Sequence, residues 1–425
     1  MRTPLTLRAY RLTTSLASPL SGWWLDRRLS RGREDSERLG ERYGLSPAPR
    51  PEGALVWIHG ASVGEAFSLD PVVRRLVSDG RACVMTTGTV TSAKLLESRL
   101  PAGARHQYAP LDAPGPMRKF FAHWRPDLGL IAESEIWPNM IMEAARARVP
   151  LGLVNARLSE RSFARWKRAP KLIGALLGRF EFCLAQTPLD AERWHALGAP
   201  NVSVAGNLKY DASAPPVERE EFAVLSGALA GRKIWVAAST HPGEELIAAQ
   251  AQRRVEQDVP EALTIIAPRH AARGPHIREE LAARGFAVEL RSEGATLGAR
   301  SRIYVADTMG ELGLFYRLAG LVFMGKSLCG EGGQNPIEPA KLGSALLHGP
   351  MVGNFRDVYD ALDAEGGALS VADGADLARR LIGLFNDAAA QRRMARAALK
   401  CVEARAGASE RVIAAAAPWL PAPVP

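Results

Sequence analysis

Short apolar runs alternate with longer amphipathic stretches from residue 54 onward, and a turn separates each one from the next. Runs that are apolar throughout, such as Leu128–Ala132, are typical of parallel strands buried on both faces. The predicted strands are Ala54–His59, Ala82–Thr86, Leu128–Ala132, Leu151–Asn155, Phe182–Ala185, Val202–Ala205, Ile234–Ala238, Leu263–Ala267, Ala287–Leu290, Ile303–Ala306, Leu321–Met324 and Ala345–His348. The pattern therefore predicts an α/β protein.

Helical periodicity falls between these strands. The clearer predicted helices are Phe67–Ser78, Val90–Arg99, Trp137–Arg148, Leu189–Leu197, Glu244–Val255, Gly310–Leu318 and Ala375–Leu384. The sequence DASAPPV separates the two series, so we expect Rossmann-like, doubly wound domains at 51–210 and 218–400 joined by a linker at 211–217. An N-terminal segment, 1–50, and a C-terminal helix and tail, 401–425, flank them. Ligands of such sheets bind outside the carboxyl ends of the strands, so two facing domains predict a cleft with half a site on each side.

Bulk properties agree with two soluble domains. A chain of 425 residues is too long for one ordinary core, and its 47% hydrophobic and 23% charged content is that of a globular protein. The four cysteines form no CxxC pair, which indicates a reducing compartment and argues against a zinc site or a disulfide framework. We expect Cys329 to be a small filler rather than a nucleophile.

The N-terminal segment carries most of the net charge. Of the total of +9, residues 1–33 contribute +6, from seven Arg and one Asp, which leaves +3 for the other 392 residues. Arg8 and Arg11 interrupt its apolar residues, so neither a spanning helix nor a signal peptide is expected. With Trp23 and Trp24 it fits a helix lying on an anionic membrane surface, or else a basic helix packed on its own domain. Nothing indicates a nucleic acid, and no protein partner is predicted.

The run FMGKSLCGEGGQNPIEP, residues 323–339, is the most informative stretch. A short strand leads into a loop with four glycines, and a helix is expected to start at Pro336. Glycines let the backbone approach a ligand and leave N–H groups free, and a helix N-terminus favours phosphate. Glu338, in the first turn, is suited to accepting hydrogen bonds from sugar hydroxyls. The run therefore predicts a nucleotide site, although an ordinary strand-to-helix turn also carries glycines. Its spacing matches neither GxGxxG nor GxxxxGK[ST].

Acidic residues follow the predicted strands of the first half. Glu65 comes just after the first strand, where it is either a general base or a helix-start carboxylate favoured by the macrodipole. Glu133 and Glu135 end another strand beside Trp137, which resembles a sugar-handling wall. Lys209 precedes the linker, so its ammonium is expected to point into the cleft. Thr89 follows another strand, where its hydroxyl either contacts a polyol or phosphate or simply caps the next helix.

Basic residues follow the strands of the second half. Arg269 is a good phosphate ligand because its planar fork matches phosphate oxygens. Asp307 and Thr308 end the strand before the Gly-rich run, and either one can be explained as a helix cap alone. His241 and His270 lack the spacing of metal ligands, so no metal is expected.

Taken together, these segments resemble the bacterial 3-deoxy-D-manno-octulosonic acid (Kdo) transferases over roughly residues 50–360. The resemblance is carried by WIHGASVGE, TTGTVTSAKLL, ESEIWPN, GNLKYD, ASTHPGEE, PRH, DTMGEL and GKSLCGEGGQNPIEP, which occur in the family's order. It implies a GT-B glycosyltransferase, with the acceptor site in the first domain and the nucleotide-sugar site in the second. It also implies inverting transfer of Kdo from CMP-Kdo to the lipid A precursor, in lipopolysaccharide synthesis, on the cytoplasmic face of the inner membrane.

The resemblance implies roles for particular residues. Glu65 would be the catalytic base, and Glu135 and Lys209 would stabilise the transition state. The residues implied to hold CMP are Pro268, Arg269, Met309, Gly310, Glu311, Asn335, Pro336, Ile337 and Glu338. No metal cofactor is implied, since side chains and helix N-termini suffice for a single phosphate. Gln334 stands where the family usually has His, and the N-terminus is less apolar than the family's usual anchor. The rival hypotheses are a GT-B enzyme acting on a UDP-sugar, either a transferase or a 2-epimerase, and a non-catalytic nucleotide-binding scaffold at a membrane surface.

Overall fold

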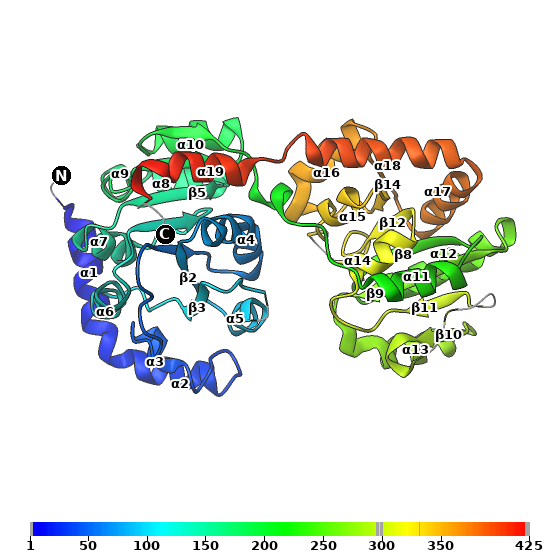
Figure 1. Ribbon diagram of the computed structural model, residues 1–425, viewed down its shortest axis with the longest axis horizontal. Helices are drawn as coiled ribbons and strands as arrows, with labels where there is room; N and C mark the ends of the chain where they lie inside the picture. Colours follow the sequence, from blue (N-terminus) through cyan, green and yellow to red (C-terminus); the bar gives the residue numbers. More distant parts are fainter. Residues whose placement is uncertain (1–2, 98, 295–296, 298–300, 331, 421–425) are drawn as a thin grey trace. The chain divides into compact units, whose positions relative to one another are not determined.

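The computed structural model describes residues 3–97, 99–294, 297, 301–330 and 332–420. The chain forms two compact units, each with one parallel sheet (Figure 1). The first unit comprises Met1–Ala212 together with Arg405–Pro425, and the second comprises Ser213–Ala404. The predicted α/β class with two doubly wound domains is confirmed. Position 331 of the Gly-rich run and the end of the predicted tail, 421–425, lie outside the described residues.

The sheet of the first unit has the strand order β3-β2-β1-β4-β5-β6-β7, and every pair is parallel. Its strands are β1 Leu55–His59, β2 Ala82–Thr87, β3 Ala104–Tyr108, β4 Leu128–Ala132, β5 Leu151–Ala156, β6 Phe182–Ala185 and β7 Val202–Val204. The chain adds strands on one side of β1 and then on the other, so the order reverses between β1 and β4. Ligands of doubly wound sheets bind at this reversal, beyond the carboxyl ends of the strands.

Helices cover both faces of this sheet (Figure 1). They are α1 Leu5–Ala17, α2 Ser21–Leu29, α3 Leu39–Arg42, α4 Val63–Ser78, α5 Val90–Glu97, α6 Pro114–Trp124, α7 Pro138–Arg146, α8 Glu160–Lys167, α9 Pro170–Leu177, α10 Pro188–Ala196 and α19 Ala408–Ala416, with short 3₁₀ turns at η1 Ser18–Leu20, η2 Leu208–Asp211 and η6 Ala417–Trp419. The central strands are fully buried, as their unbroken apolar runs require.

The second sheet has the order β10-β11-β9-β8-β12-β13-β14 and is also entirely parallel. Its strands are β8 Lys233–Thr240, β9 Ala262–Pro268, β10 Val288–Leu290, β11 Ile303–Val305, β12 Leu321–Met324, β13 Ala345–His348 and β14 Ala368–Ser370. Here the order reverses between β8 and β12. The Gly-rich run follows β12, so it begins at this reversal.

The helices of the second unit alternate with its strands. They are α11 Arg219–Ala228, α12 Glu244–Asp258, α13 Gly274–Ala282, α14 Leu312–Leu318, α15 Ile337–Lys341, α16 Arg356–Ala364, α17 Gly374–Asn386 and α18 Ala388–Glu403, with 3₁₀ turns at η3 Ala271–Arg273, η4 Arg291–Glu293 and η5 Gly353–Phe355. One apolar cluster packs between the sheet and α12, α13, α17 and α18.

The pattern missed two edge strands and the destination of the C-terminal helix. β3 reads ARHQY and is polar over its first half, and β14 has only three residues, so neither forms an apolar run. Helix α19, red in Figure 1, belongs to the first unit and packs on α4 and η2. Asp211 fixes its start, since the carboxylate accepts the N–H groups of Gly407 at 2.7 Å and Ser409 at 2.5 Å.

Helix α1 packs on α6 and α7 through one face. Leu7 is fully buried there, Tyr10 donates to Asp112 Oδ2 at 2.9 Å, and Arg11 pairs with the buried Glu143. The opposite face leaves apolar side chains in solvent: Leu5, Leu12 and Leu16, followed by Leu20, Trp23 and Trp24. Within the described residues, none of the helices has the length and hydropathy to cross a bilayer.

Candidate active site

Glu65 lies in the first turn of α4, directly after β1. Its carboxylate accepts the N–H of Ala61 at 2.7 Å and the hydroxyl of Ser62 at 2.8 Å, while Ser62 Oγ accepts the N–H of Glu65 at 3.3 Å. This reciprocal arrangement is a helix cap, so Glu65 does stabilise the start of α4, and its role as a general base stays a prediction. The same bonds hold the half-buried carboxylate in one orientation at the edge of the sheet.

Two more carboxylates follow β4, the neighbour of β1. Glu133 adopts a left-handed backbone with φ 52°, an uncommon conformation for a side chain of this kind. The Trp137 indole donates to Glu135 Oε2 at 2.6 Å. Burial and the negative charges of Glu65 and Glu133 together raise the pKa of Glu135 to about 7, although the hydrogen bond from Trp137 lowers it. A carboxyl group with this pKa exchanges its proton near neutral pH.

Lys209 belongs to the same electrostatic cluster. Burial raises the pKa of Glu133, and the ammonium of Lys209 is the main influence lowering it. Lys209 lies in η2, whose start is held by two side-chain amides. The N–H of Leu208 donates to Asn155 Oδ1 at 3.0 Å, and the N–H of Lys209 donates to Asn207 Oδ1 at 3.0 Å. Asn155, the next-to-last residue of β5, has φ 50°. Loops far apart in sequence therefore bring Glu65 within electrostatic reach of Glu133 and Glu135, and Lys209 within reach of Glu133.

His59 is the last residue of β1 and is fully buried. Its Nδ1 lies 2.9 Å from Thr86 Oγ1, its ring meets that of Trp137 edge-on at 5.2 Å, and Nε2 has no hydrogen-bond partner within the described part of the chain. Burial lowers the pKa of His59 to about 4, so the imidazole is neutral at pH 7. The sequence analysis gave this residue no role. A histidine closing an otherwise apolar strand was the available signal.

In the second unit, positive side chains gather at the carboxyl ends of three adjacent strands. Pro268 is buried at the end of β9, and the backbone of the exposed Arg269 is fixed by its N–H, which donates to Thr240 O at 3.0 Å. The rings of His241 and His270 lie 6.1 Å apart. Burial and then the positive charge of Lys326 lower the pKa of His241. Lys326, with φ 57°, follows β12.

Met309, Gly310 and Glu311 follow β11. Gly310 has φ 87°, which favours glycine, and Met309 is exposed. Glu311 accepts hydrogen bonds from Arg291, at 2.7 Å to Oε2, and from the hydroxyl of Thr308. Burial alone would raise the pKa of Glu311, and these two hydrogen bonds bring it below its usual value. The Glu311 side chain is thus engaged within the protein. A ligand could contact this segment through its backbone and through Met309.

The expectation of free N–H groups in the Gly-rich loop is wrong for its first half. Glu244, the first residue of α12, is fully buried, and its carboxylate accepts the N–H groups of Lys326, Ser327, Leu328 and Cys329 at 2.6, 2.9, 3.1 and 3.3 Å. A charge from within the protein therefore occupies the position in which an anionic ligand was expected. Gly333 N–H also bonds within the loop, to Lys326 O at 2.8 Å.

The helix after the loop begins at Ile337, one residue later than predicted, and Pro336 is its N-cap. Asn335 Oδ1 accepts the N–H of Ile337 at 3.1 Å, so Asn335 also shapes the turn. Glu338 lies in the first turn, as predicted. Gln334 Nε2 is 3.1 Å from His241 Nε2, which joins this loop to the loop after β8.

Each unit thus has a set of polar side chains beside the reversal of its strand order. The first is acidic with one lysine, and the second is basic. The described residues contain no group of three or more His, Cys, Asp or Glu side chains able to hold a metal ion.

A family model described as 3-deoxy-D-manno-octulosonic-acid transferase (kdotransferase) matches residues 37–212. A 3-deoxy-D-manno-octulosonic acid transferase of Bordetella pertussis is 32% identical over 426 residues, covering 97% of this chain and 99% of the relative. This chain belongs to the 3-deoxy-D-manno-octulosonic acid transferase family. A probable mitochondrial 3-deoxy-D-manno-octulosonic acid transferase of Arabidopsis thaliana is 37% identical over 366 residues, covering 84% of this chain and 82% of the relative.

Membership of the Kdo transferase family confirms the predicted family and makes the protein a glycosyltransferase. A solved UDP-GlcNAc 2-epimerase of Neisseria meningitidis has a TM-score of 0.58 and covers 85% of this chain and 99% of its own. At 13% identity it shows the fold alone, which agrees with the predicted GT-B architecture. The UDP-sugar enzymes and the non-catalytic scaffold are not favoured as functions.

Besides His59, sequence reasoning on this Kdo transferase missed Glu244 and Lys326. Glu244 looked like an ordinary acidic residue at a helix start, where the macrodipole favours one. Only its five accepted N–H groups, four from the Gly-rich loop and one from His241 at 2.9 Å, reveal that it orders two loops at once.

Proposed function

We propose that this Kdo transferase moves Kdo from CMP-Kdo to a hydroxyl of the lipid A precursor, with inversion and with Glu65 as general base. One observation carries the proposal. Glu65 lies within electrostatic reach of Glu133 and Glu135, and Lys209 lies within reach of Glu133, where the strand order of the first sheet reverses; this is where doubly wound sheets bind ligands. The fixed orientation of Glu65 favours a positioned base over a mobile surface carboxylate.

In the proposed reaction Glu65 takes the proton of the acceptor hydroxyl. The oxygen attacks the anomeric carbon of Kdo while the bond from that carbon to the phosphate oxygen of CMP breaks, and CMP leaves with the electron pair. Glu135, with its pKa near 7, can remain protonated beside ionised Glu65 and donate a hydrogen bond. Lys209 offsets negative charge that develops in the transition state.

The donor is proposed to bind at the basic edge of the second unit. Arg269 is exposed and has no ion-pair partner within the described part of the chain, so its guanidinium is available to the single phosphate of CMP. Glu338 is proposed to accept a ribose hydroxyl, and the other residues proposed to hold CMP are Pro268, Met309 to Glu311 and Asn335 to Ile337. Since side chains can neutralise one phosphate, the proposed reaction requires no metal.

The test is the pair Glu65→Gln and Asp70→Asn. Both remove a carboxylate from α4, but Asp70 bonds Arg74 at 2.7 Å on the helix surface. We expect Glu65→Gln to lower transfer from CMP-Kdo to the tetraacyl lipid A precursor by at least 100-fold, measured by mass spectrometry of the lipid, with CMP affinity unchanged. Asp70→Asn should keep its turnover. Normal turnover of Glu65→Gln would remove Glu65 as the base.

A thermal-shift titration separates the donor proposal from its rivals. CMP should stabilise the protein, and the Arg269→Ala variant should lose much of that stabilisation. Stabilisation by UDP but not by CMP would contradict a CMP-linked donor, whatever the result for Glu65.

We also propose that the protein acts at the cytoplasmic face of the inner membrane, bound peripherally through its N-terminal helices. Helix α1 is tied to its unit by one face, and the other exposes Leu5, Leu12 and Leu16, the last two at 61% and 70%. Leu20 and Trp23 continue this apolar surface. Exposed apolar side chains beside arginines fit insertion at an anionic lipid surface.

The membrane proposal is tested with Leu12→Ser combined with Leu16→Ser. Binding to anionic liposomes should fall by at least tenfold, because about 2 kcal/mol of apolar burial is lost. Val224→Ser, which changes a 70% exposed valine in the second unit, is the control. Equal binding by all three proteins would leave α1 as a helix that only packs on its own unit.

A further inference from the structure

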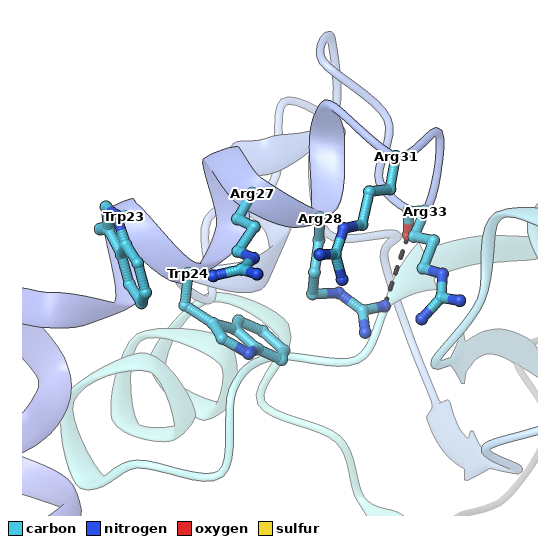
Figure 2. Close-up of a pocket in the computed structure, with 6 residues that line it drawn as sticks. All are labelled: Trp23, Trp24, Arg27, Arg28, Arg31 and Arg33. Carbon is cyan, nitrogen blue, oxygen red and sulfur yellow. Dashed lines mark hydrogen bonds between the residues drawn. The ribbon is translucent and has the colours of Figure 1, made fainter.

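A basic pocket lies at the end of α2, on the same N-terminal segment. It is lined by Trp23, Trp24, Arg27, Arg28, Arg31 and Arg33 and has a volume of about 280 Å³ (Figure 2). Figure 2 shows the four arginines projecting from α2 and the turn that follows it, with the indole rings of Trp23 and Trp24 toward one end of the row and Arg31 and Arg33 toward the other.

The aromatic rings orient two of the arginines. The Arg27 guanidinium carbon lies 5.9 Å from the centre of the Trp23 ring, and that of Arg28 lies 4.8 Å from the centre of the Trp24 ring. Arg28 also donates to Glu34 at 2.6 Å and to Arg33 O at 3.4 Å, which fixes the turn. A guanidinium held against a ring keeps its edge N–H groups free to donate.

The remaining charges are not neutralised from within the protein. Arg27, Arg31 and Arg33 are exposed, and no carboxylate among the described residues pairs with any of them. Three guanidinium groups without counterions around one pocket repel one another, and an anion among them relieves that repulsion. The exposed leucines of α1 adjoin this segment in the chain, so the anion would be met at a lipid surface.

We propose that this pocket binds the phosphomonoester headgroup of an anionic membrane lipid. A phosphomonoester carries between one and two negative charges near pH 7 and presents three terminal oxygens, each able to accept from a guanidinium fork. A phosphodiester headgroup offers two such oxygens and one charge. The pocket should therefore prefer phosphomonoester lipids over other anionic lipids at equal surface charge. This inference rests on the proposed membrane association and adds headgroup selectivity to it.

The test uses Arg31→Lys with Arg33→Lys, which keeps the charge and removes the planar forks. Arg8→Lys is the matched control, because Arg8 is also exposed on the N-terminal helices and has no ion pair within the described part of the chain. Binding is measured to vesicles of phosphatidic acid or phosphatidylserine in phosphatidylcholine, matched in zeta potential. We expect the wild type and Arg8→Lys to prefer phosphatidic acid by about tenfold, and the double variant to lose that preference while keeping its affinity for phosphatidylserine. An equal loss for both lipids, or no loss, would overturn the headgroup site.

A second measurement does not depend on membrane binding. The indole N–H signals of Trp23 and Trp24 are followed by NMR during titration with a short-chain phosphatidic acid below its critical micelle concentration. Saturable shifts in the wild type that are absent from the double variant support the pocket even if vesicle binding fails. Unchanged indole signals would overturn it even if vesicles bind.

A different observation carries a second inference, on the Gly-rich loop. Glu244 accepts four consecutive N–H groups of this loop, 326–329, and the N–H of His241. Its neighbour Glu245 accepts the Thr240 hydroxyl at 3.0 Å and Arg273 at 2.7 Å, which ties the loop after β9 to the same helix start. Two buried carboxylates therefore connect the loops that carry Arg269, His270 and Lys326.

We infer that Glu244 is a positioning residue for the donor site, acting through the loop backbone and touching no substrate. In Glu244→Gln one oxygen becomes an NH₂ group that faces N–H donors, so at least two of the five bonds are lost. The loop then samples other conformations, and part of the binding energy of the nucleotide goes into ordering it. Donor affinity should fall while the acid cluster, in the other unit, stays intact.

Glu244→Gln is compared with Glu256→Gln, a partly buried carboxylate on the same helix. We expect KM for CMP-Kdo to rise about tenfold with kcat changed less than threefold, and amide exchange to accelerate at 326–329 but not in β8 or β12. Glu256→Gln should show neither effect. A loss of kcat at constant KM, or unchanged exchange at 326–329, would overturn the role. Because amide exchange needs no substrate, this readout stands even if the donor is not CMP-Kdo.

Discussion

Glu135→Gln should make the stability of the first unit less dependent on pH. Burial, with the negative charges of Glu65 and Glu133, raises the pKa of Glu135 from 4.5 to about 7, so the folded state binds a proton that the unfolded state releases between these values. The contribution of Glu135 to stability is thus fully present below pH 4.5 and is lost as pH rises through 7. The difference, at 1.36 kcal/mol per pH unit, gives an upper limit of about 3 kcal/mol. Solvent screening at this partly exposed site reduces the expectation to about 2 kcal/mol between pH 5 and pH 8.

The assay is urea denaturation of the wild type and Glu135→Gln at pH 5 and pH 8, followed by hydrogen exchange in the strands of the first unit. Comparing the two proteins at both values cancels all other titrating groups. The amide of Gln keeps an oxygen to accept from the Trp137 indole, so packing is preserved. Glu192→Gln removes an exposed carboxylate from the same unit and should show no such pH dependence. The raised pKa of Glu135 would be refuted if the substitution changed stability equally at both pH values. It would also be refuted if the variant, relative to the wild type, were more stable at pH 5 than at pH 8.

Three further predictions concern contacts that stabilise each unit internally. Arg11→Met should destabilise the first unit by about 2 kcal/mol in urea denaturation, because the buried Glu143 keeps only arginines at 3.7 and 3.8 Å; no loss would mean that these two suffice. Gly313→Ala should destabilise the second unit by about 2 kcal/mol, since the added carbon would lie 2.2 Å from the carbonyl oxygen of Pro216; an unchanged midpoint would contradict this close contact. Asp211→Ala should cost about 1 kcal/mol and make α19 more susceptible to limited proteolysis, because two N–H groups at its start lose their acceptor; equal cleavage rates would count against the cap.

The strands that the sequence predicted correctly are the ones whose residues are apolar on both faces. Leu128–Ala132, Phe182–Ala185, Leu321–Met324 and Ala345–His348 have the predicted bounds, because a buried parallel strand cannot contain polar residues without a partner. The edge strand β3 has solvent on one side and needs no such run. Its polar sequence therefore gave no signal.

The candidate site was predictable as a set of residues following strands and was not predictable as a network. Glu65, Glu135 and Lys209 each follow a strand, and this alone places them at one edge of the sheet. The raised pKa of Glu135 depends on burial and on the charges of other loops, which no local pattern contains. The Gly-rich loop is also beyond local prediction. The N–H groups expected to be free at its start donate to Glu244, about 80 residues earlier in the chain.

The sequence by itself determined the two doubly wound domains and the family of the protein, because strand burial and multi-residue motifs are local along the chain. Only the tertiary structure decided which charges meet. It placed three carboxylates and a lysine in one cluster, filled the anion position of the Gly-rich loop with a buried glutamate, and returned the C-terminal helix to the first unit. These outcomes depend on hydrogen bonds and Coulomb interactions between residues far apart in sequence, whose energies are set by distance and burial in the folded protein.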